Sequence, residues 1–435
     1  MSDLKDKLEQ LKREKKTRSK SQRIQDNWKK IDKNEDVSVK EKLQKLINLT
    51  QEEKSPKAQK SSFEPLSREP VQYFENAYPL DYRYGKIILS WGLDVASDIL
   101  AGFSGNPAFE ELNLSTALFL DLETTGLSGG TGVVPFLVGM GYYSENKFYV
   151  VQYFLGDLAA EERMVGELAE FFEQMNFQSV ITFNGKGFDM PLMETRFILN
   201  RCPFILSELP HLDFLYPARS LWKHKYESCG LSYLACNVLK TGRTEDIPSA
   251  EVPWRYFQYL RSGNFELVEP VLYHNQEDLL SLLGILVRGA LIFSEEGDEE
   301  IADAMDLFGA GKIMENRGEI EKSVLFYKKA LEGKLNPQVS LKAKQKLSLF
   351  FKKTQEWNKA VSLWKEITSM ETSPRIQLFS IRELAMYLEH REKDYQEAKR
   401  LAEEGWVLSR GISSYYERDF SYRLQRLKRK LGEIL

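Results

Sequence analysis

The sequence predicts an α/β domain followed by an all-helical repeat region, and three observations support this fold class. Apolar, strand-like runs alternate with amphipathic helical segments between about residues 79 and 293. From about residue 303 onward the strand pattern vanishes and one helical pattern occurs three times. Residues 1–60 are highly charged and hold few apolar side chains for a core. The expected divisions are an N-terminal arm and linker (1–78), an α/β domain (79–295) and helical repeats (300–435).

The α/β domain is expected to contain a mixed sheet flanked by helices. Residues 116–122 are almost continuously apolar, which is typical of a central strand covered on both faces. Residues 136–143 and 148–154 are rich in Val, Tyr and Phe, and their short connection predicts an antiparallel pair. The elements expected next are a helix over 161–174, a strand over 179–183 and a helix over 190–200.

The helical region shows the small and large residue spacing of tetratricopeptide helix pairs. The pattern that begins at Ile320 returns at Trp357 and again at Tyr395, at spacings of 37 and 38 residues. The usual repeat has about 34 residues, so we expect enlarged turns. Generic helical hairpins give a similar pattern. Three pairs are about the minimum for a self-supporting stack, because each pair buries its apolar face against its neighbours.

Charge and composition limit the possible partners. The 435 residues include 60 Lys and Arg and 64 Asp and Glu, a net charge of −4, so nucleic acid could be bound only through a local patch. Residues 1–60 carry 18 basic and 11 acidic side chains, which suits either a solubilising arm or a phosphate-binding tether. The three cysteines have no zinc-site spacing, which indicates a reducing compartment. No signal peptide or membrane span is evident, so we expect a cytoplasmic protein without membrane contact.

Two carboxylates lie on the predicted central strand. Asp121 and Glu123 are two residues apart, so both point to the same face of the sheet. Two neighbouring acids among apolar residues repel each other and are costly to desolvate, and a divalent cation would relieve both effects. Oxygen ligands of this kind suit Mg²⁺ or Mn²⁺. The alternative is an exposed strand end with two solvated acids.

Three further polar residues lie on apolar elements. Asp189 follows a glycine-rich turn at the start of a predicted helix, where it could also serve only as an N-cap. His274 and Asp278 are four residues apart on an apolar helical stripe, where they could instead form a surface pair. A histidine there could accept a proton near neutral pH. Asp213, also in an apolar setting, is interpreted as a structural hydrogen-bonding acid, with a fifth metal ligand as the alternative.

With these motifs the chain resembles the DEDD exonucleases of the ribonuclease H-like superfamily, and in particular the bacterial YprB-like group. The resemblance covers residues 80–293 and includes the stretches 211–219, 242–248 and 251–253. It implies a ribonuclease H-like sheet, helical repeats after the nuclease domain, and 3′–5′ exonuclease activity with two Mg²⁺ or Mn²⁺ ions. The metal carboxylates that it implies are Asp121, Glu123, Asp189 and Asp278. In DEDD enzymes a fifth site residue precedes the last aspartate, either a histidine with four intervening residues or a tyrosine with three. Here His274 has three intervening residues before Asp278 and Tyr273 has four, the reverse of both arrangements. Helical geometry favours His274, because its spacing of four places it on the same face as Asp278.

The expected reaction is hydrolysis of phosphodiester bonds by in-line attack of water, on the 3′ ends of single-stranded DNA or RNA. Expected nucleic-acid contacts are Thr124, Thr125, Gly126, Asn184, Arg219, Lys223 and Arg243. Trp222 and Lys225 are candidates for an aromatic and cationic platform, although the whole group could equally be a solvated face. The competing hypothesis is a catalytically silent scaffold that recruits a protein partner through its helical repeats.

Overall fold

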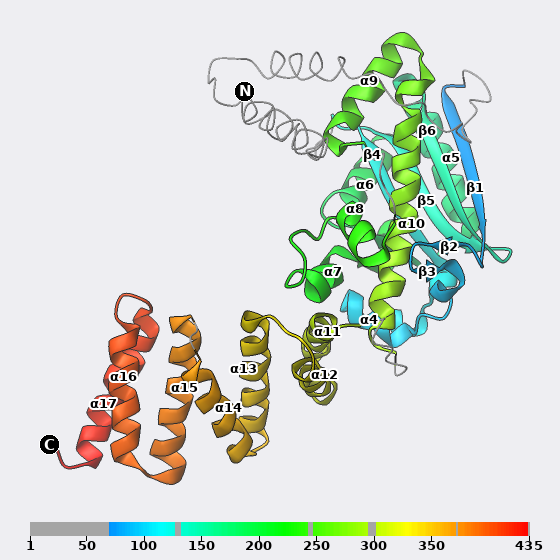
Figure 1. Ribbon diagram of the computed structural model, residues 1–435. Helices are drawn as coiled ribbons and strands as arrows, with labels where there is room; N and C mark the ends of the chain where they lie inside the picture. Colours follow the sequence, from blue (N-terminus) through cyan, green and yellow to red (C-terminus); the bar gives the residue numbers. More distant parts are fainter. Residues whose placement is uncertain (1–68, 127–131, 242–246, 295–301, 371–372, 434–435) are drawn as a thin grey trace, which may run out of the picture.

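A computed structural model describes residues 69–126, 132–241, 247–294, 302–370 and 373–433. It consists of an α/β part and a helical part (Figure 1). They join where α11 (Ala304–Asn316) and α12 (Ile320–Glu332) follow the long helix α10 (Glu269–Leu291). The predicted fold class, a mixed sheet flanked by helices and followed by an all-helical region, is confirmed. Within the described ranges, no helix has both the length and the apolar character that crossing a membrane requires.

The α/β part is built on a mixed sheet with strand order β1-β6-β5-β4-β7-β8 among the described residues. The first four strands in this order pair antiparallel, whereas β7 and β8 run parallel to β4. In chain order the strands are β1 (Val71–Pro79), β4 (Ala117–Thr124), β5 (Pro135–Ser144), β6 (Lys147–Leu155), β7 (Ser179–Thr182) and β8 (His211–Asp213). A short hairpin of β2 (Arg83–Tyr84) and β3 (Ile87–Ile88) lies outside this sheet.

Strand β1 corrects the predicted domain boundary. Residues 71–78 were expected in the N-terminal arm and linker, but they pair with β6 along its whole length, from Val71 opposite Leu155 to Pro79 opposite Lys147. The strand alternates buried and exposed positions, because it lies at the edge of the sheet. Gln72, Glu75 and Asn76 interrupt its apolar residues, so it lacks the continuous apolar run of a central strand.

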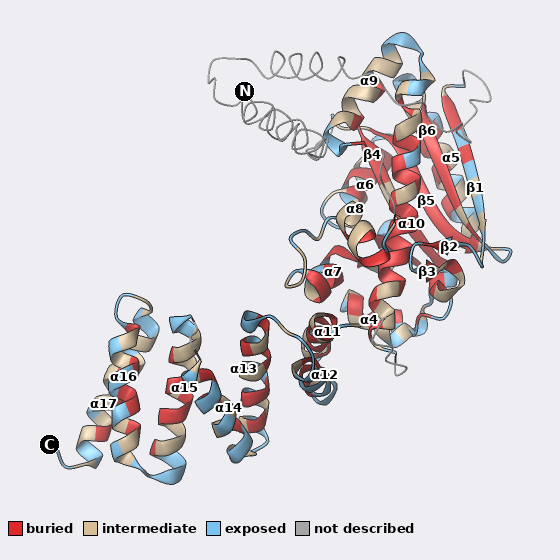
Figure 2. Ribbon diagram, in the orientation of Figure 1, coloured by how far each residue is buried: buried red, intermediate tan, exposed pale blue. Residues whose placement is uncertain are grey.

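Helices cover both faces of the sheet, and each face has its own core. On one face, Ala117 and Phe119 pack with the second half of α10 (Glu269–Leu291); on the other, Leu118 and Leu120 pack with α5 and α6. The sheet and α10 are mostly buried (Figure 2). The other helices of this part are α4 (Ser97–Ser104), α5 (Glu161–Met175), α6 (Asp189–Leu199), α7 (Leu215–Trp222), α8 (Leu231–Leu234) and α9 (Val252–Ser262).

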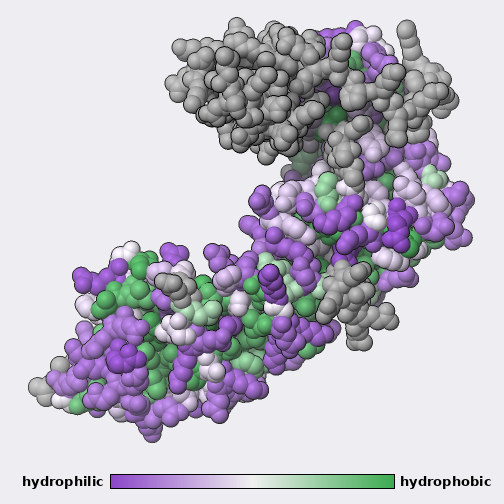
Figure 3. All heavy atoms as spheres, viewed as in Figure 1, coloured by the Kyte–Doolittle hydropathy of each residue, from purple (hydrophilic) through white to green (hydrophobic). Residues whose placement is uncertain are grey.

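The helical part, residues 302–433, consists of helix pairs and one final helix. Its helices are α11 (Ala304–Asn316), α12 (Ile320–Glu332), α13 (Pro337–Lys353), α14 (Trp357–Ser369), α15 (Pro374–Tyr387), α16 (Tyr395–Ser409) and α17 (Ser414–Lys430). The second helix of each pair begins at Ile320, Trp357 or Tyr395, where the sequence pattern repeats. Small residues of the pattern, such as Ala330 and Ala360, are fully buried. In Figure 3, hydrophobic residues show most clearly over this part.

The two parts share a core at their junction. Helix α11 packs against α7, and its residues Ala310 and Ile313 belong to the α/β core that contains Phe214 and Leu221. The approach is close at Gly309, where an added Cβ would lie 2.5 Å from the carbonyl oxygen of Leu221. A larger residue there would require the two helices to move apart.

Candidate active site

Asp121 and Glu123 lie on the face of β4 that is turned toward α10. Their neighbour Phe119 on the same face belongs to the core under α10, whereas Leu120 and Leu122 point into the opposite core. Both acids follow the alternation of the strand, which breaks only at a register shift between Glu123 and Thr124. The two carboxylates therefore share one face, as their spacing predicts.

Helix α10 places His274 between two of the acids. The side chain is buried, and its Nε2 lies 3.6 Å from Oε1 of Glu123 and 3.4 Å from Oδ2 of Asp278. Asp278 follows one turn after His274 on the same helix face. Tyr273, the other candidate for the fifth residue, is 46% exposed. The geometry supports His274 as the residue that faces the carboxylates.

Asp189 is the first residue of α6 and is buried. The N-cap position belongs to Phe188, and no side-chain capping bond is made there. The alternative, that Asp189 serves only as an N-cap, is therefore wrong. A buried acid at this position gains from the positive end of the helix dipole, but it still loses much of its hydration.

Asp213, at the end of β8, holds the turn that leads to Asp189. Its carboxylate accepts hydrogen bonds from the backbone N–H groups of Asn184 at 2.7 Å and Lys186 at 3.1 Å. It also accepts one from the N–H of Leu215 at 3.1 Å, at the start of α7. This arrangement confirms the interpretation of Asp213 as a structural acid.

The acids affect each other's ionisation. Burial raises the pKa of Asp121 well above its usual value, and the charges of Asp278, Glu123 and Asp189 raise it further, while His274 opposes them. Burial, followed by the charge of Asp213, raises the pKa of Asp189 to about 7. The protein thus gathers carboxylates that resist full ionisation at neutral pH when no cation is nearby.

These carboxylates are the right chemical type to bind a hard divalent cation, but their atoms are not arranged around a common centre. Carboxylate oxygens from β4, α6 and α10 are the ligand type that Mg²⁺ and Mn²⁺ prefer, and their mutual repulsion would favour a cation. In the described part of the chain, however, no three His, Cys, Asp or Glu side chains are placed to hold a metal ion together. Binding would therefore require some of these side chains to move closer together.

Asn275 is a site residue that the sequence analysis missed. It is fully buried, and its Nδ2 donates hydrogen bonds to Oδ2 of Asp121 at 2.8 Å and to the Asp121 carbonyl oxygen at 3.1 Å. Its Oδ1 accepts a hydrogen bond from Nε2 of Gln152 at 2.7 Å. Gln152 also donates to the carbonyl oxygen of Leu272 at 2.8 Å. The asparagine thus fixes the orientation of the Asp121 carboxylate.

Gly139 makes room for this contact. Asp121, Gly139 and Gln152 lie opposite one another on β4, β5 and β6. A Cβ on Gly139 would lie 2.0 Å from Oδ1 of Asn275. The Asn275 side chain can therefore lie over β5 and contact both Asp121 and Gln152 only because residue 139 is a glycine. The sequence signals for this network are a glycine and a glutamine, each within an otherwise apolar strand.

The turn after β4 uses its hydroxyl groups internally. Thr124 Oγ1 donates to the carbonyl oxygen of Gly126 at 2.7 Å, and Thr125 Oγ1 accepts from the N–H of Val134 at 3.0 Å. Asn184 has a positive φ of 71° in the turn that Asp213 holds. Residues 127–131, which include Gly129 and Gly130, lie outside the described residues, as does Arg243.

Two candidate contacts on and after α7 are contradicted. Trp222 is only 2% exposed, and its Nε1 donates to Oδ1 of Asp306 at 3.1 Å, so it offers no aromatic platform. Lys225 forms ion pairs with Asp306 at 2.7 Å and Asp303 at 2.8 Å. Both residues serve the junction with α11, whereas Arg219 and Lys223 are exposed.

Comparisons with known proteins show the family of this chain. A family model described as RNase_H superfamily matches residues 118–288. The uncharacterized protein YprB of Bacillus subtilis (strain 168) is 30% identical over 368 residues, which are 82% of this chain and 85% of YprB. The chain belongs to the YprB family. In this YprB family member, the RNase H superfamily domain runs from β4 into α10 and therefore contains Asp121, Glu123, Asp189, His274 and Asp278.

Among solved structures, the YprB family member is similar to the family B DNA polymerase from the hyperthermophilic archaeon Pyrobaculum calidifontis. The match covers 48% of this chain at 16% identity, with a TM-score of 0.34. It spans 28% of the polymerase chain.

Proposed function

We propose that this protein is a metal-dependent nuclease, a DEDD-type 3′–5′ exonuclease that hydrolyses single-stranded nucleic acid. The observation that carries the proposal is the position of His274, with Nε2 within 3.6 Å of both Glu123 and Asp278, at the end of the sheet where Asp121 lies. The RNase H superfamily match includes each of these residues. The 3′–5′ polarity and the preference for single strands rest on the resemblance to DEDD exonucleases.

The side chains suit this chemistry. Divalent cations held by Asp121, Glu123, Asp189 and Asp278 would supply an acidified water and neutralise the leaving oxygen. His274 would accept the proton of the attacking water, and its two carboxylate neighbours would stabilise the imidazolium that results. Asn275 would keep the Asp121 carboxylate oriented throughout.

We propose that the helical part is a tetratricopeptide-like stack, as the spacing of its buried residues suggests. The alternative function, a silent scaffold, finds some support in a cavity of about 620 Å³ between α14 and α16. Its lining includes the apolar residues Val361 and Leu401 and the charged residues Glu397 and Arg400. A protein partner could dock there whether or not the nuclease domain is active.

Oligonucleotides labelled at the 5′ end, incubated with Mg²⁺, Mn²⁺ or a chelator, test the proposal. We expect a ladder of products that shorten from the 3′ end, and only with a metal ion present. A phosphorothioate-blocked 3′ end should stop the reaction, which separates exonuclease from internal cleavage. Intact substrate under every condition, with DNA and RNA in single-stranded, duplex and tailed forms, would contradict the proposal and favour the scaffold.

Asn275→Ala should weaken Mn²⁺ binding about 10- to 100-fold, because it releases the Asp121 carboxylate from its fixed orientation. It should also leave Gln152 without its asparagine acceptor and lower the free energy of unfolding by about 1–3 kcal/mol. Titration calorimetry measures the first effect and urea unfolding the second. Gln174→Ala, at an exposed position of α5, is the control and should change neither value. Unchanged Mn²⁺ affinity in Asn275→Ala would show that the asparagine has only a structural role.

A further inference from the structure

Helix α7 and the residue that follows it present an aromatic side chain and two cations on one exposed face. Tyr216, Arg219 and Lys223 follow one another at i, i+3 and i+7, which places them along a single helix stripe. Tyr216 is 56% exposed. The opposite side of the helix, with Leu221 and Trp222, is buried against the core. Tyr216 thus offers an exposed aromatic ring beside two cations, whereas the ring of Trp222 is buried.

Lys312 of α11 extends this charged face across the junction. Its Nζ donates to the carbonyl oxygen of Ser220 at 3.3 Å, directly beside Arg219 in the sequence. The junction that holds it there is tight, since Trp222 bonds Asp306 and Gly309 contacts the backbone of Leu221. The positions of these cations relative to one another are therefore set by packed helices.

Helix α13 adds two more cations. Lys342 and Lys346 are exposed and lie one turn apart, and α13 packs against α11. Burial lowers the pKa of Lys312, and the charges of Lys342, Lys223 and Lys346 lower it further. Lys342, Lys223 and Lys346 thus lie close enough to Lys312 to repel it.

Most of this positive charge is not neutralised by neighbours. Within the described ranges, no carboxylate lies within ion-pair distance of Arg219, Lys223, Lys312 or Lys342, whereas Lys346 pairs with Glu315. Like charges that are held together without acidic partners destabilise a protein unless an anion binds to them. The whole chain has a net charge of −4, so the concentration of positive charge at these residues is a local feature that indicates a site for an anion.

We propose that Tyr216, Arg219, Lys223, Lys312, Lys342 and Lys346 form a binding surface for single-stranded nucleic acid, the α7–α13 surface. The cations would contact successive phosphates, and Tyr216 would stack on a base, a combination that suits unpaired strands. The proposal deepens the nuclease function and rests on it for the substrate class. Helix α7 begins two residues after Asp213, which holds the turn before Asp189, and eight helical residues span about 12 Å. A strand with its 3′ end at the carboxylates could continue along α7 onto the helical part.

Fluorescence anisotropy with the full chain in EDTA tests this surface without any cleavage. The probes are 24-nucleotide single strands of DNA and of RNA with one sequence, and the matching duplexes. Arg219→Glu and Lys342→Glu should each weaken single-strand binding about tenfold or more at low salt. Lys342→Ala should reduce the slope of log affinity against log salt by about 0.7. Tyr216→Leu should weaken binding about tenfold with an unchanged salt slope, and Tyr216→Phe should restore it.

Matched controls separate this surface from general charge effects. Arg375→Glu, on the exposed start of α15, makes the same charge change, and Tyr415→Leu removes a tyrosine that is also 56% exposed. Both should bind like the wild type, and thermal melting should show every variant folded. Equal binding by Arg219→Glu, Lys342→Glu and Arg375→Glu would overturn the proposal, as would tighter binding of duplex than of single strands. Binding that depends on these residues in a chain without nuclease activity would support the surface and contradict only the catalytic proposal.

Discussion

Asp121→Asn should slow metal-dependent shortening of oligonucleotides on the order of a thousandfold. The carboxylate lies on β4 in the field of Asp278, Glu123 and Asp189, and Asn275 holds its Oδ2. Loss of its charge would remove several kcal/mol of the charge stabilisation that a bound cation provides to the transition state. The measurement is the single-turnover rate of 3′ shortening, with saturating enzyme, at several Mn²⁺ concentrations.

The same variant separates a catalytic role from a structural one. Because burial and neighbouring acids already raise the pKa of Asp121, a neutral isostere should not destabilise the metal-free fold. The melting temperature of Asp121→Asn without metal should therefore equal or exceed that of the wild type, and its rise on addition of Mn²⁺ should be smaller. Asp81→Asn, in an exposed turn, is the matched control and should retain both activity and the Mn²⁺ effect. A metal-free Asp121→Asn chain that melts well below the wild type would indicate a structural carboxylate.

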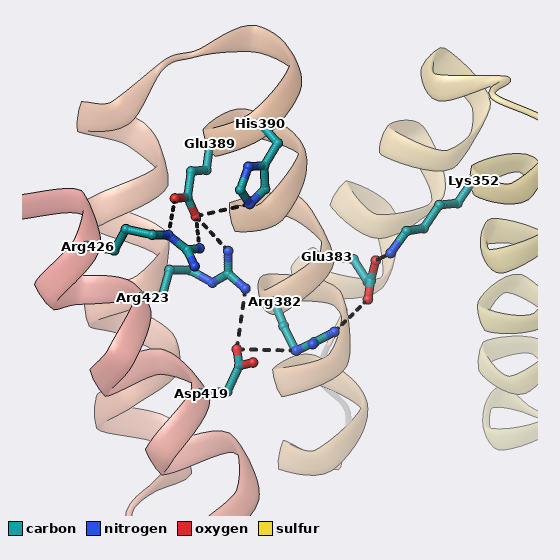
Figure 4. Close-up of polar contacts among 8 residues, drawn as sticks. All are labelled: Lys352, Arg382, Glu383, Glu389, His390, Asp419, Arg423 and Arg426. Atoms are coloured by element: carbon teal, nitrogen blue, oxygen red, sulfur yellow. Dashed lines mark hydrogen bonds and ion pairs between the residues drawn. The ribbon is translucent and has the colours of Figure 1, made fainter. Parts of the chain in front are cut away.

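Glu389→Ala should destabilise the helical part by about 3–5 kcal/mol. The Glu389 side chain is fully buried after α15 and pairs with Arg423 at 2.7 Å and with Arg426 at 2.5 Å, both from α17 (Figure 4). Lys430, also of α17, lies 2.9 Å from the same carboxylate. Its removal leaves Arg423, whose side chain is only 6% exposed, with Asp419 at 3.5 Å but without its shorter ion pair to Glu389. Amide hydrogen exchange should increase in α15–α17 and stay unchanged in β4.

This ion-pair group also predicts a dependence of stability on pH. Burial alone would raise the pKa of Glu389, but hydrogen bonds from Arg426 and Lys430 and the charges of Arg426 and Arg423 lower it to about 2. The folded form therefore holds its charge at a pH where the unfolded form, with a pKa near 4.5, is protonated. Its contribution is present above about pH 4.5 and is lost as the pH falls toward 2.

The difference between the unfolding free energies of the wild type and Glu389→Gln isolates this contribution. It should be constant near neutral pH and shrink as the pH falls below about 4.5. Glu403→Gln, at an exposed position of α16, should show no such trend. A difference that is the same at pH 3 and pH 7 would contradict the assigned role of Glu389.

Local patterns predicted much of the fold. The strand expected over 116–122 is β4 at Ala117–Thr124, and the helix expected over 161–174 is α5 at Glu161–Met175. Both have apolar patterns that repeat within a few residues, so the sequence reveals them without tertiary information. β1 was missed because an edge strand needs only one apolar face, and its polar half resembles the charged arm before it.

The candidate site was predictable in part. The two-residue spacing of Asp121 and Glu123 and the four-residue spacing of His274 and Asp278 each place a pair on one face, whatever the rest of the fold. Asn275 was not predictable in this way, because its partners Asp121 and Gln152 lie more than a hundred residues away. Nothing in the residues around Asn275 indicates that it would cross Gly139.

The sequence by itself determined which side chains share a strand or helix face, since those relations depend only on backbone geometry. Only the tertiary structure decided which cations and aromatic rings remain available. Trp222 and Lys225 contact Asp306 of α11. Tyr216 and Arg219 of α7, and Lys223 just after it, are exposed. The physical reason is that burial and ion pairing depend on neighbours from distant segments, and here those neighbours are Asp303 and Asp306 of the helical part.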